Sequence, residues 1–156
     1  MATYEGTKMA EPGRFAIVAA RFNQSVVDRL VDGAKEGFQR QGVGEESVDL
    51  IWVPGSFEIP LVAKRLASSG RYAAVVCLGA VIRGDTDHYE YVAGEAARGV
   101  AEASLSTGVP VIFGILTCAT EEQALDRAGG QEGNKGHDAA LAAIEMANLL
   151  RQLPGK

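Results

Sequence analysis

The feature of this 156-residue sequence that most restricts its fold is a set of four continuous apolar runs separated by amphipathic stretches. The runs cover residues 15–20, 48–53, 73–80 and 109–116. Unbroken apolar runs, unlike alternating ones, are typical of strands that are buried on both faces, as in parallel sheets. Parallel strands require long crossover connections, and the intervening stretches are long enough to hold helices. We therefore predict a four-stranded parallel sheet.

The first crossover has apolar residues at helical spacing between residues 26 and 38, and Ser25 with Asp28 predicts a capping box at its start. Further helices are predicted over residues 57–67, 89–107 and 135–150. Pro60 fits the second helix because it falls in the first turn. Thr120 and Gln123 predict another capping box, opening a short helix that ends at the 129–130 glycine pair. This order predicts an α/β three-layer sandwich of the flavodoxin-like type.

Composition supports one compact domain, because 47% of the residues are hydrophobic in a chain of this length. We predict a single domain over residues 1–156, with 1–13 as an N-terminal extension. The net charge of −5 and the scattered basic residues argue against nucleic acid or a membrane surface as a partner. The sequence contains neither a signal core nor a membrane-spanning run, which predicts a cytoplasmic protein. Cys77 and Cys118 lack disulfide or zinc-site spacing, so we expect two buried thiols and no metal.

Ligands of open α/β sheets bind beyond the carboxyl ends of the strands, where loop amides and helix N-termini converge. Four predicted strand exits carry polar and aromatic residues there. The first exit has Arg21, Phe22 and Asn23, and the second covers residues 54–58. The third covers residues 81–88, and the fourth leads through Phe113 to Thr120. We expect any functional site at this edge of the sheet.

Taken singly, these residues have two interpretations each. Phe22 either closes the core or offers a platform for stacking. Ser56 and Glu58 either cap a helix or bind a polyhydroxylated chain. His88 is either a solvated loop histidine or a group that transfers protons near neutral pH. His137 lies in the first turn of the last predicted helix and is assigned no role.

Phosphate chemistry is restricted by the segment that begins at Gly79. Its glycine spacing resembles a phosphate-binding P-loop, but Asp85 stands where that motif requires lysine. A carboxylate cannot replace the cation that meets β and γ phosphates, which argues against nucleotide triphosphate hydrolysis. A single phosphate held by backbone amides and a remote arginine stays open. Arg127 and Lys135, beside glycine-rich turns, are either surface residues or ligands of such an anion.

Read together, the segments Arg21-Phe22-Asn23, Val53-Pro54-Gly55-Ser56-Phe57-Glu58-Ile59-Pro60, Gly79 to His88 and Gly133-Asn134-Lys135-Gly136 resemble the lumazine synthase family of riboflavin biosynthesis. Phe113-Gly114, the 121–129 helix and the Ala143-Ile144-Glu145-Met146-Ala147-Asn148 ending extend the likeness over nearly the whole chain. The resemblance implies condensation of 5-amino-6-(D-ribitylamino)uracil with 3,4-dihydroxy-2-butanone 4-phosphate. The products are 6,7-dimethyl-8-ribityllumazine, phosphate and water. No metal or organic cofactor is implied.

The resemblance also implies roles for particular residues. Phe22 stacks on the pyrimidine ring, while Phe113 closes the heterocycle site. His88 transfers protons, and Arg127 binds the phosphate with Lys135 nearby. Contacts to the ribityl chain, the ring edge and the phosphate pocket are implied for Asn23, Ser56, Phe57, Glu58, Ala80, Val81, Ile82, Asp85 and Thr86. One departure is that Asp85 and Asp87 stand where family members often have small or hydroxyl residues. Asp85 is therefore expected to offer its backbone amide, and Asp87 to cap a helix.

The resemblance implies assembly into pentamers, with the site between neighbouring subunits. The short segment 128–135 favours twelve pentamers in an icosahedral shell, and riboflavin synthase is a candidate partner. Two other functions are weighed against this enzyme, since a fold alone does not decide function. One is a non-catalytic flavin-binding or shell-forming protein, and the other is an archaeal-type riboflavin synthase. Retention of His88, Arg127 and Lys135 favours the lumazine synthase reaction.

Overall fold

The protein is a three-layer α/β sandwich around one parallel sheet, as described by a computed structural model for residues 1–155. The central sheet consists of β1 (Phe15–Ala20), β2 (Val48–Val53), β3 (Ala74–Ile82) and β4 (Val111–Cys118). All of its neighbouring strands run parallel, in the order β2-β1-β3-β4. This architecture confirms the predicted flavodoxin-like class.

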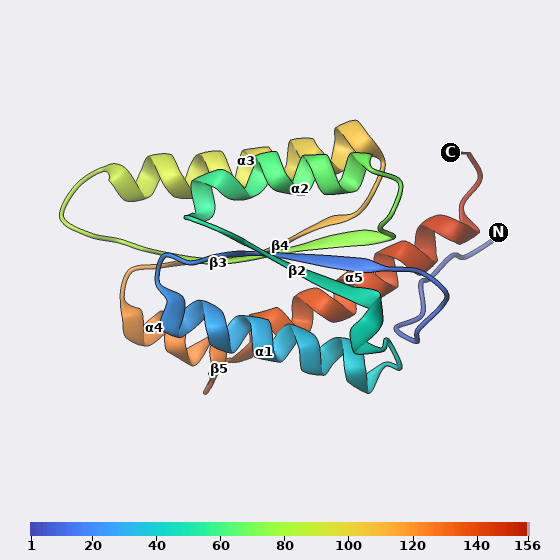
Figure 1. Cartoon of the computed structure of the whole chain (residues 1–156), viewed down its shortest axis with the longest axis horizontal. Coiled ribbons are helices and arrows are strands. Elements are labelled where there is room, and N and C mark those ends of the chain that lie inside the picture. Colours follow the sequence, from blue (N-terminus) through green and yellow to red (C-terminus); the bar gives the residue numbers. More distant parts are fainter. Residues whose placement is uncertain (156) are drawn as a thin grey trace.

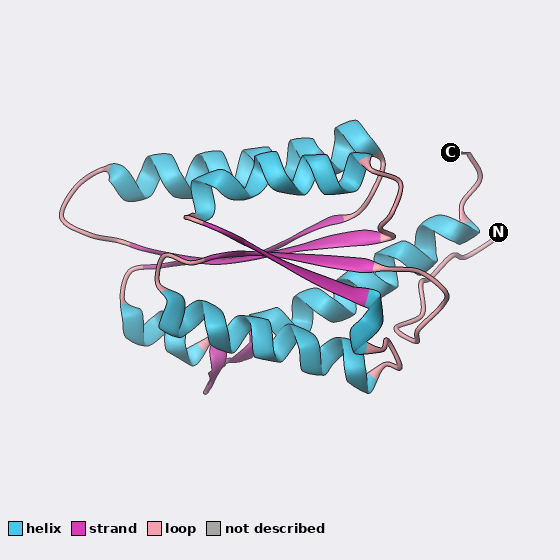
Figure 2. Cartoon of the chain, viewed as in Figure 1, coloured by secondary structure: helices cyan, strands magenta, loops and turns pink. Residues whose placement is uncertain are grey.

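Helices cover both faces of the sheet (Figures 1 and 2). On one face lie α2 (Ile59–Ser68) and α3 (His88–Thr107). On the other lie α1 (Gln24–Arg40), α4 (Glu121–Asp126) and α5 (Lys135–Gln152). Two short 3₁₀ helices, η1 (Glu45–Ser47) and η2 (Ser56–Glu58), stand before β2 and α2. In the described chain, no helix has the length and apolar character needed to cross a bilayer.

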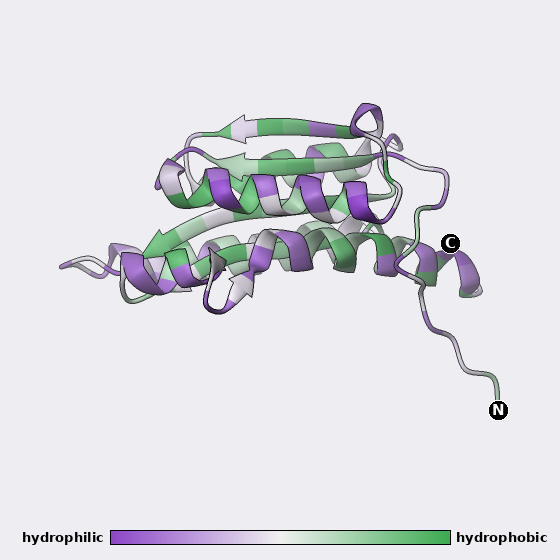
Figure 3. Ribbon diagram, turned by 90° about the horizontal axis from the view of Figure 1, so that it is seen from below, coloured by the Kyte–Doolittle hydropathy of each residue, from purple (hydrophilic) through white to green (hydrophobic). Residues whose placement is uncertain are grey.

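Both faces of the inner strands are buried, which explains their unbroken apolar sequence. In β1, Ile17 packs with α1 and α5, whereas its neighbour Val18 packs with α2 and α3. Figure 3 shows that the strands of the central sheet consist mainly of hydrophobic residues, whereas hydrophobic and hydrophilic residues alternate along the helices. Cys77 and Cys118 are free and buried, as predicted. Complete burial raises the pKa of the Cys77 thiol, which makes it an inert apolar side chain.

The two edge strands differ from the predicted burial. In β2 only Val53 is fully buried, because no strand pairs with its outer side among residues 1–155. In β4 both Phe113 and Thr117 are exposed for the same reason. Both β3 and β4 also extend further toward their carboxyl ends than predicted. A two-stranded hairpin, β5 (Ala128–Gly130) with β6 (Gly133–Asn134), was missed because three- and two-residue strands have no apolar pattern.

Helix starts show which local predictions hold. The Ser25–Asp28 capping box is wrong: α1 begins at Gln24, and its N-cap Asn23 has a left-handed backbone with φ 62°. The Thr120 cap is confirmed, since the Thr120 hydroxyl accepts from Gln123 N at 3.1 Å. The return bond differs from the predicted box, because Gln123 Oε1 accepts from Ala119 N at 2.9 Å and not from Thr120 N. Pro60 lies in the first turn of α2, also as predicted.

Candidate active site

A cavity of about 730 Å³ opens at the carboxyl ends of β1, β2 and β3, beside the start of α3. We call it the carboxyl-end cavity. It brings together ten of the residues named from the sequence, from four separate segments. These are Phe22, Asn23, Ser56, Phe57, Glu58, Ala80, Val81, Ile82, Thr86 and His88. Parallel strands explain the convergence, because their carboxyl ends meet at one edge of the sheet.

The first wall of this cavity is the turn after β1. Its backbone is tied to the segment after β2, since Arg21 N donates to Val53 O at 2.8 Å and Phe22 N donates to Pro54 O at 3.1 Å. Asn23 Nδ2 donates to Ala80 O at 2.7 Å and so joins the first and third strand exits. Phe22 itself is 71% exposed at the cavity. The interpretation of Phe22 as a plug for the core is therefore wrong.

The second wall is the segment that leads into α2. Ser56 is only 5% exposed, while Phe57 and Glu58 face solvent. A Cβ on Gly79 would come within 2.5 Å of Ser56 Oγ, so only glycine in β3 lets Ser56 lie this deep. Glu58 occupies the N-cap position of α2, yet its side chain makes no capping hydrogen bond to any described residue. Its carboxylate is therefore available to a ligand with hydroxyl donors.

The third wall is formed by the loop after β3 and the first turn of α3. His88 is the first residue of α3, and its backbone N–H makes a long hydrogen bond of 3.4 Å to Thr86 Oγ1. Asp87 holds the N-cap position, but no capping bond from its side chain occurs within residues 1–155. Asp85 is exposed, and neither cavity lined by described residues includes it.

Sequence reasoning missed several cavity residues on α3. Tyr89, Tyr91 and Val92 line the same cavity as His88, and Tyr91 is 70% exposed. A helix places residues three and four positions apart on one face, so His88 shares its face with Tyr91 and Val92. That spacing was the signal that would have found Tyr91 and Val92.

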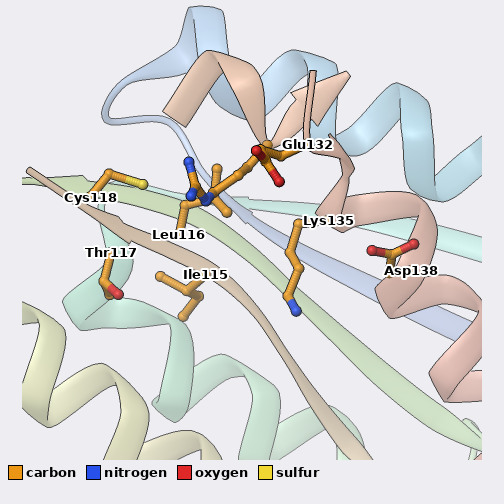
Figure 4. A pocket seen from close by; sticks show the side chains of 8 residues that line it. Ile115, Leu116, Thr117, Cys118, Glu132, Lys135 and Asp138 are labelled. Atoms are coloured by element: carbon orange, nitrogen blue, oxygen red, sulfur yellow. The ribbon is translucent and has the colours of Figure 1, made fainter. Parts of the chain in front are cut away.

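A second cavity, of about 370 Å³, lies at the outer edge of β4; we call it the β4-edge cavity. Figure 4 shows the β4 residues Ile115–Cys118 on one side of it and Glu132, Lys135 and Asp138 on the other. Arg127 also lines it, and Lys135 N donates to Arg127 O at 2.8 Å. The two cavities share no lining residue in the described chain. Within one subunit, Arg127 and Lys135 thus line a different cavity from His88.

Charges of both signs surround the β4-edge cavity. Arg127 Nη1 donates to Gln123 O at 3.0 Å, which leaves other guanidinium donors for an anion. Burial raises the pKa of Cys118 there, and the nearby Arg127 charge partly opposes that shift. Phe113 lies in the middle of β4, where it pairs with Cys77. Its expected place at the exit of this strand is therefore wrong. No group of three or more residues able to hold a metal ion occurs in the part of the chain described.

The carboxyl-end cavity combines the exposed ring of Phe22, the Glu58 carboxylate, the backbone amides at the end of β3 and the His88 imidazole. Such groups suit a planar heterocycle with a hydroxylated chain and a reaction that moves protons. The β4-edge cavity offers two cations, which suit an anionic group.

Comparison with known proteins identifies relatives across nearly the whole chain. A family model described as 6,7-dimethyl-8-ribityllumazine synthase matches residues 12–151. A protein of that name from Deinococcus radiodurans is 58% identical over 153 residues, which are 98% of this chain and 99% of the relative. A protein of the same name from Clostridium kluyveri is 52% identical over 153 residues, which again are 98% of this chain and 99% of the relative. The chain therefore belongs to the 6,7-dimethyl-8-ribityllumazine synthase family.

Proposed function

We propose that this protein condenses 5-amino-6-(D-ribitylamino)uracil with 3,4-dihydroxy-2-butanone 4-phosphate to give 6,7-dimethyl-8-ribityllumazine, phosphate and water. The observation that carries the proposal is the carboxyl-end cavity, which gathers ten of the residues that the family resemblance implies. Membership of the family, with relatives at 52–58% identity, supports the same reaction.

The heterocyclic substrate binds in the carboxyl-end cavity. Its ring stacks on Phe22, whose exposed face is held in place by the turn after β1. Ser56, Phe57 and Glu58 hold the ribityl chain, with the free Glu58 carboxylate accepting hydroxyl hydrogens. Asn23 and the 80–82 strand end contact the ring edge and the start of the chain.

Proton transfers follow from the position of His88 in the same cavity. The substrate amine attacks the ketone, and loss of one water gives a Schiff base. Removal of a proton and departure of phosphate yield an enol, which becomes a ketone. The ribityl-bearing amine then attacks that ketone and a second water leaves. His88 acts as acid and base in these steps, and alignment of the two reactants supplies much of the acceleration. The proposed mechanism requires no metal or organic cofactor.

The phosphate is bound across a subunit boundary. Arg127, Lys135 and Phe113 belong to the β4 side of the chain, whereas His88 belongs to the other cavity. A site that needs both sets takes one from each of two copies. Such a contact uses different surfaces on the two partners, and repeated contacts of that kind close into a ring when the rotation between neighbours divides a full turn evenly. We propose a pentameric ring, twelve of which form an icosahedral shell, with riboflavin synthase as a candidate partner. Each subunit is one domain over residues 1–156, in a cytoplasmic protein.

Turnover with both purified substrates tests the reaction. Formation of fluorescent lumazine and release of phosphate, unchanged by a chelator, is the expected result. Flavin binding without turnover would instead support a non-catalytic binder, and conversion of lumazine alone would support a riboflavin synthase. Loss of activity with the chelator would contradict a metal-free mechanism.

Mixing two impaired variants tests the shared site. His88→Ala and Arg127→Ala chains, unfolded and refolded together, are expected to form mixed rings in which some boundaries carry both intact residues. At a butanone phosphate concentration well below the KM of Arg127→Ala, activity should then exceed that of either variant refolded alone. No gain on mixing, with light scattering showing mixed rings, would contradict the shared site. Light scattering of the wild type also distinguishes a pentamer from a shell of 60 chains.

Phosphate binding tests the role of Asp85. Because its side chain is exposed and outside both cavities of the described chain, we propose that it offers only its backbone N–H. Inorganic phosphate should then inhibit the wild type and Asp85→Ala almost equally. Much tighter inhibition of Asp85→Ala would show that the carboxylate opposes the anion.

A further inference from the structure

The loop between β3 and α3 is an exposed connection that carries part of the proposed site. Residues 83–88 are all exposed, yet Gly84, Thr86 and His88 line the carboxyl-end cavity. Among the described residues, the one side-chain hydrogen bond within this loop is the long one from His88 N to the Thr86 hydroxyl. Ordering an exposed loop costs backbone entropy, so its conformation depends on what holds its two ends.

Arg83 contacts both ends of this loop. Its backbone N–H donates to Cys118 O at 2.9 Å, which fixes the start of the loop to the end of β4. Its guanidinium carbon lies 4.5 Å from the centroid of the Tyr89 ring, just after the loop. Its Nη2 also lies 3.1 Å from Glu90 Oε1. Arg83 therefore joins the residues that precede Gly84 to those that follow His88.

The far end of this contact is itself anchored. Tyr89 is half-buried, packs against the core between the sheet and α2–α3, and lines the cavity beside His88. Arg83 is outside the cavity lining formed by residues 1–155, so it reaches a ligand only through its neighbours. A planar guanidinium can stack on the Tyr89 ring and pair with Glu90 at the same time, which an ammonium group cannot do equally well.

We propose that Arg83 is a positioning residue. By stacking on Tyr89 it holds the two ends of the 84–87 loop together and so fixes the positions of Thr86 and His88. The proposal deepens the proposed function and rests on it. The stack on Tyr89 contributes more to holding the loop than the ion pair with Glu90 does, because that pair is exposed and exposed pairs add little stability.

The consequence for catalysis is selective. The loop contributes to binding of the butanone phosphate and to proton transfer. In contrast, Phe22 and Ser56 are held by contacts of their own. Loss of Arg83 should therefore raise KM for the butanone phosphate and lower kcat, while KM for the ribitylaminouracil stays the same. A residue needed only for general stability would change both KM values and the melting temperature.

The test compares Arg83→Ala, Arg83→Lys and Glu90→Gln with the wild-type assembly. For Arg83→Ala we expect kcat/KM for the butanone phosphate to fall about five- to twentyfold, with Tm unchanged. Arg83→Lys keeps the charge but not the planar stack and should recover only a small part of the loss. Glu90→Gln keeps the stack and should remain within about twofold of the wild type. Full recovery by lysine, or equal losses in Arg83→Ala and Glu90→Gln, would overturn the stacking role.

Hydrogen exchange separates this proposal from the proposed reaction. In Arg83→Ala, amides 84–88 should exchange faster while the segment 54–58 exchanges as in the wild type. That result supports the role of Arg83 even if the wild type shows no turnover, in which case the proposed reaction alone fails. Wild-type exchange throughout the loop, together with wild-type kinetics, would overturn the proposal.

Discussion

The two ends of the central sheet both carry polar and aromatic residues, but these residues bond to each other at the amino end and are left open to solvent at the carboxyl end. At the amino end, Tyr72 donates its hydroxyl hydrogen to Asp49 Oδ2 at 2.6 Å, and Arg14 Nη2 donates to Asp49 Oδ1 at 2.8 Å. Both hydrogen bonds lower the pKa of Asp49, and the bond from Tyr72 has the larger effect. The same bond, together with burial, raises the pKa of Tyr72. This cluster joins the starts of β1, β2 and β3.

At the carboxyl end, the aromatic and acidic side chains do not form such a cluster. Phe22, Phe57 and Tyr91 expose most of their rings, and Glu58 makes no capping bond to a described residue. Polar groups that satisfy each other stabilise a fold, whereas groups left unsatisfied are available to a ligand. Changes at the carboxyl end should therefore affect activity, whereas changes at the amino end should affect stability.

The largest expected effect is that of His88→Ala. General acid–base catalysis by one side chain contributes at least roughly a hundredfold, so kcat should fall by about that factor. Some turnover should remain, because both substrates are still aligned. Melting temperature should not change, since His88 is exposed. His137→Ala is the matched control, and an equal loss of kcat in both variants would contradict the assignment.

Arg127→Ala is expected to raise KM for the butanone phosphate by about ten- to a hundredfold, with a smaller effect on kcat. Its guanidinium makes charge-assisted hydrogen bonds to the phosphate in the proposed complex, each contributing roughly 1.5–3 kcal/mol. Steady-state kinetics with each substrate varied in turn measures the effect. Arg40→Ala, which removes a surface arginine paired with Glu36, should leave both KM values unchanged.

Phe22→Ala should weaken binding of the ribitylaminouracil about three- to tenfold, because an aromatic stack contributes roughly 0.5–1.5 kcal/mol. Phe22→Tyr keeps the ring and should bind like the wild type. Calorimetric titration of the substrate gives the affinity directly. If the alanine and tyrosine variants bound equally well, stacking would not be the role of this ring.

Asp49→Asn is expected to leave kcat unchanged and to lower Tm at neutral pH. Because the pKa of Asp49 is lowered in the folded protein, its stabilisation is present above the ordinary carboxyl pKa of about 4. It is lost as the pH falls through the folded-state pKa. The difference in Tm between variant and wild type should therefore shrink in acid. A difference that stays constant from neutral pH to about pH 2 would contradict this account, as would a loss of kcat.

The candidate site was predictable only in part. Residues 22, 23, 56–58, 80–82 and 88 could be expected to converge, because parallel strands end at one edge. Tyr91 could have been found from its helical spacing to His88, but the sequence offers no comparable signal for Arg83. Its contact with Tyr89 depends on how the loop folds back on itself. The separation of Arg127 from His88 likewise follows from the path of β4 along the sheet edge.

Local features could be inferred without coordinates: the four strands, the order of the helices, the Thr120–Gln123 cap and the burial of both cysteines. Each depends on side chains close together in the chain or on one residue's preference for the interior. Long-range packing was needed to establish the strand order β2-β1-β3-β4, the exposed edges, the left-handed Asn23 and the two separate cavities. The physical reason is that strand pairing and burial depend on residues far apart in sequence, whose packing overrides local preference.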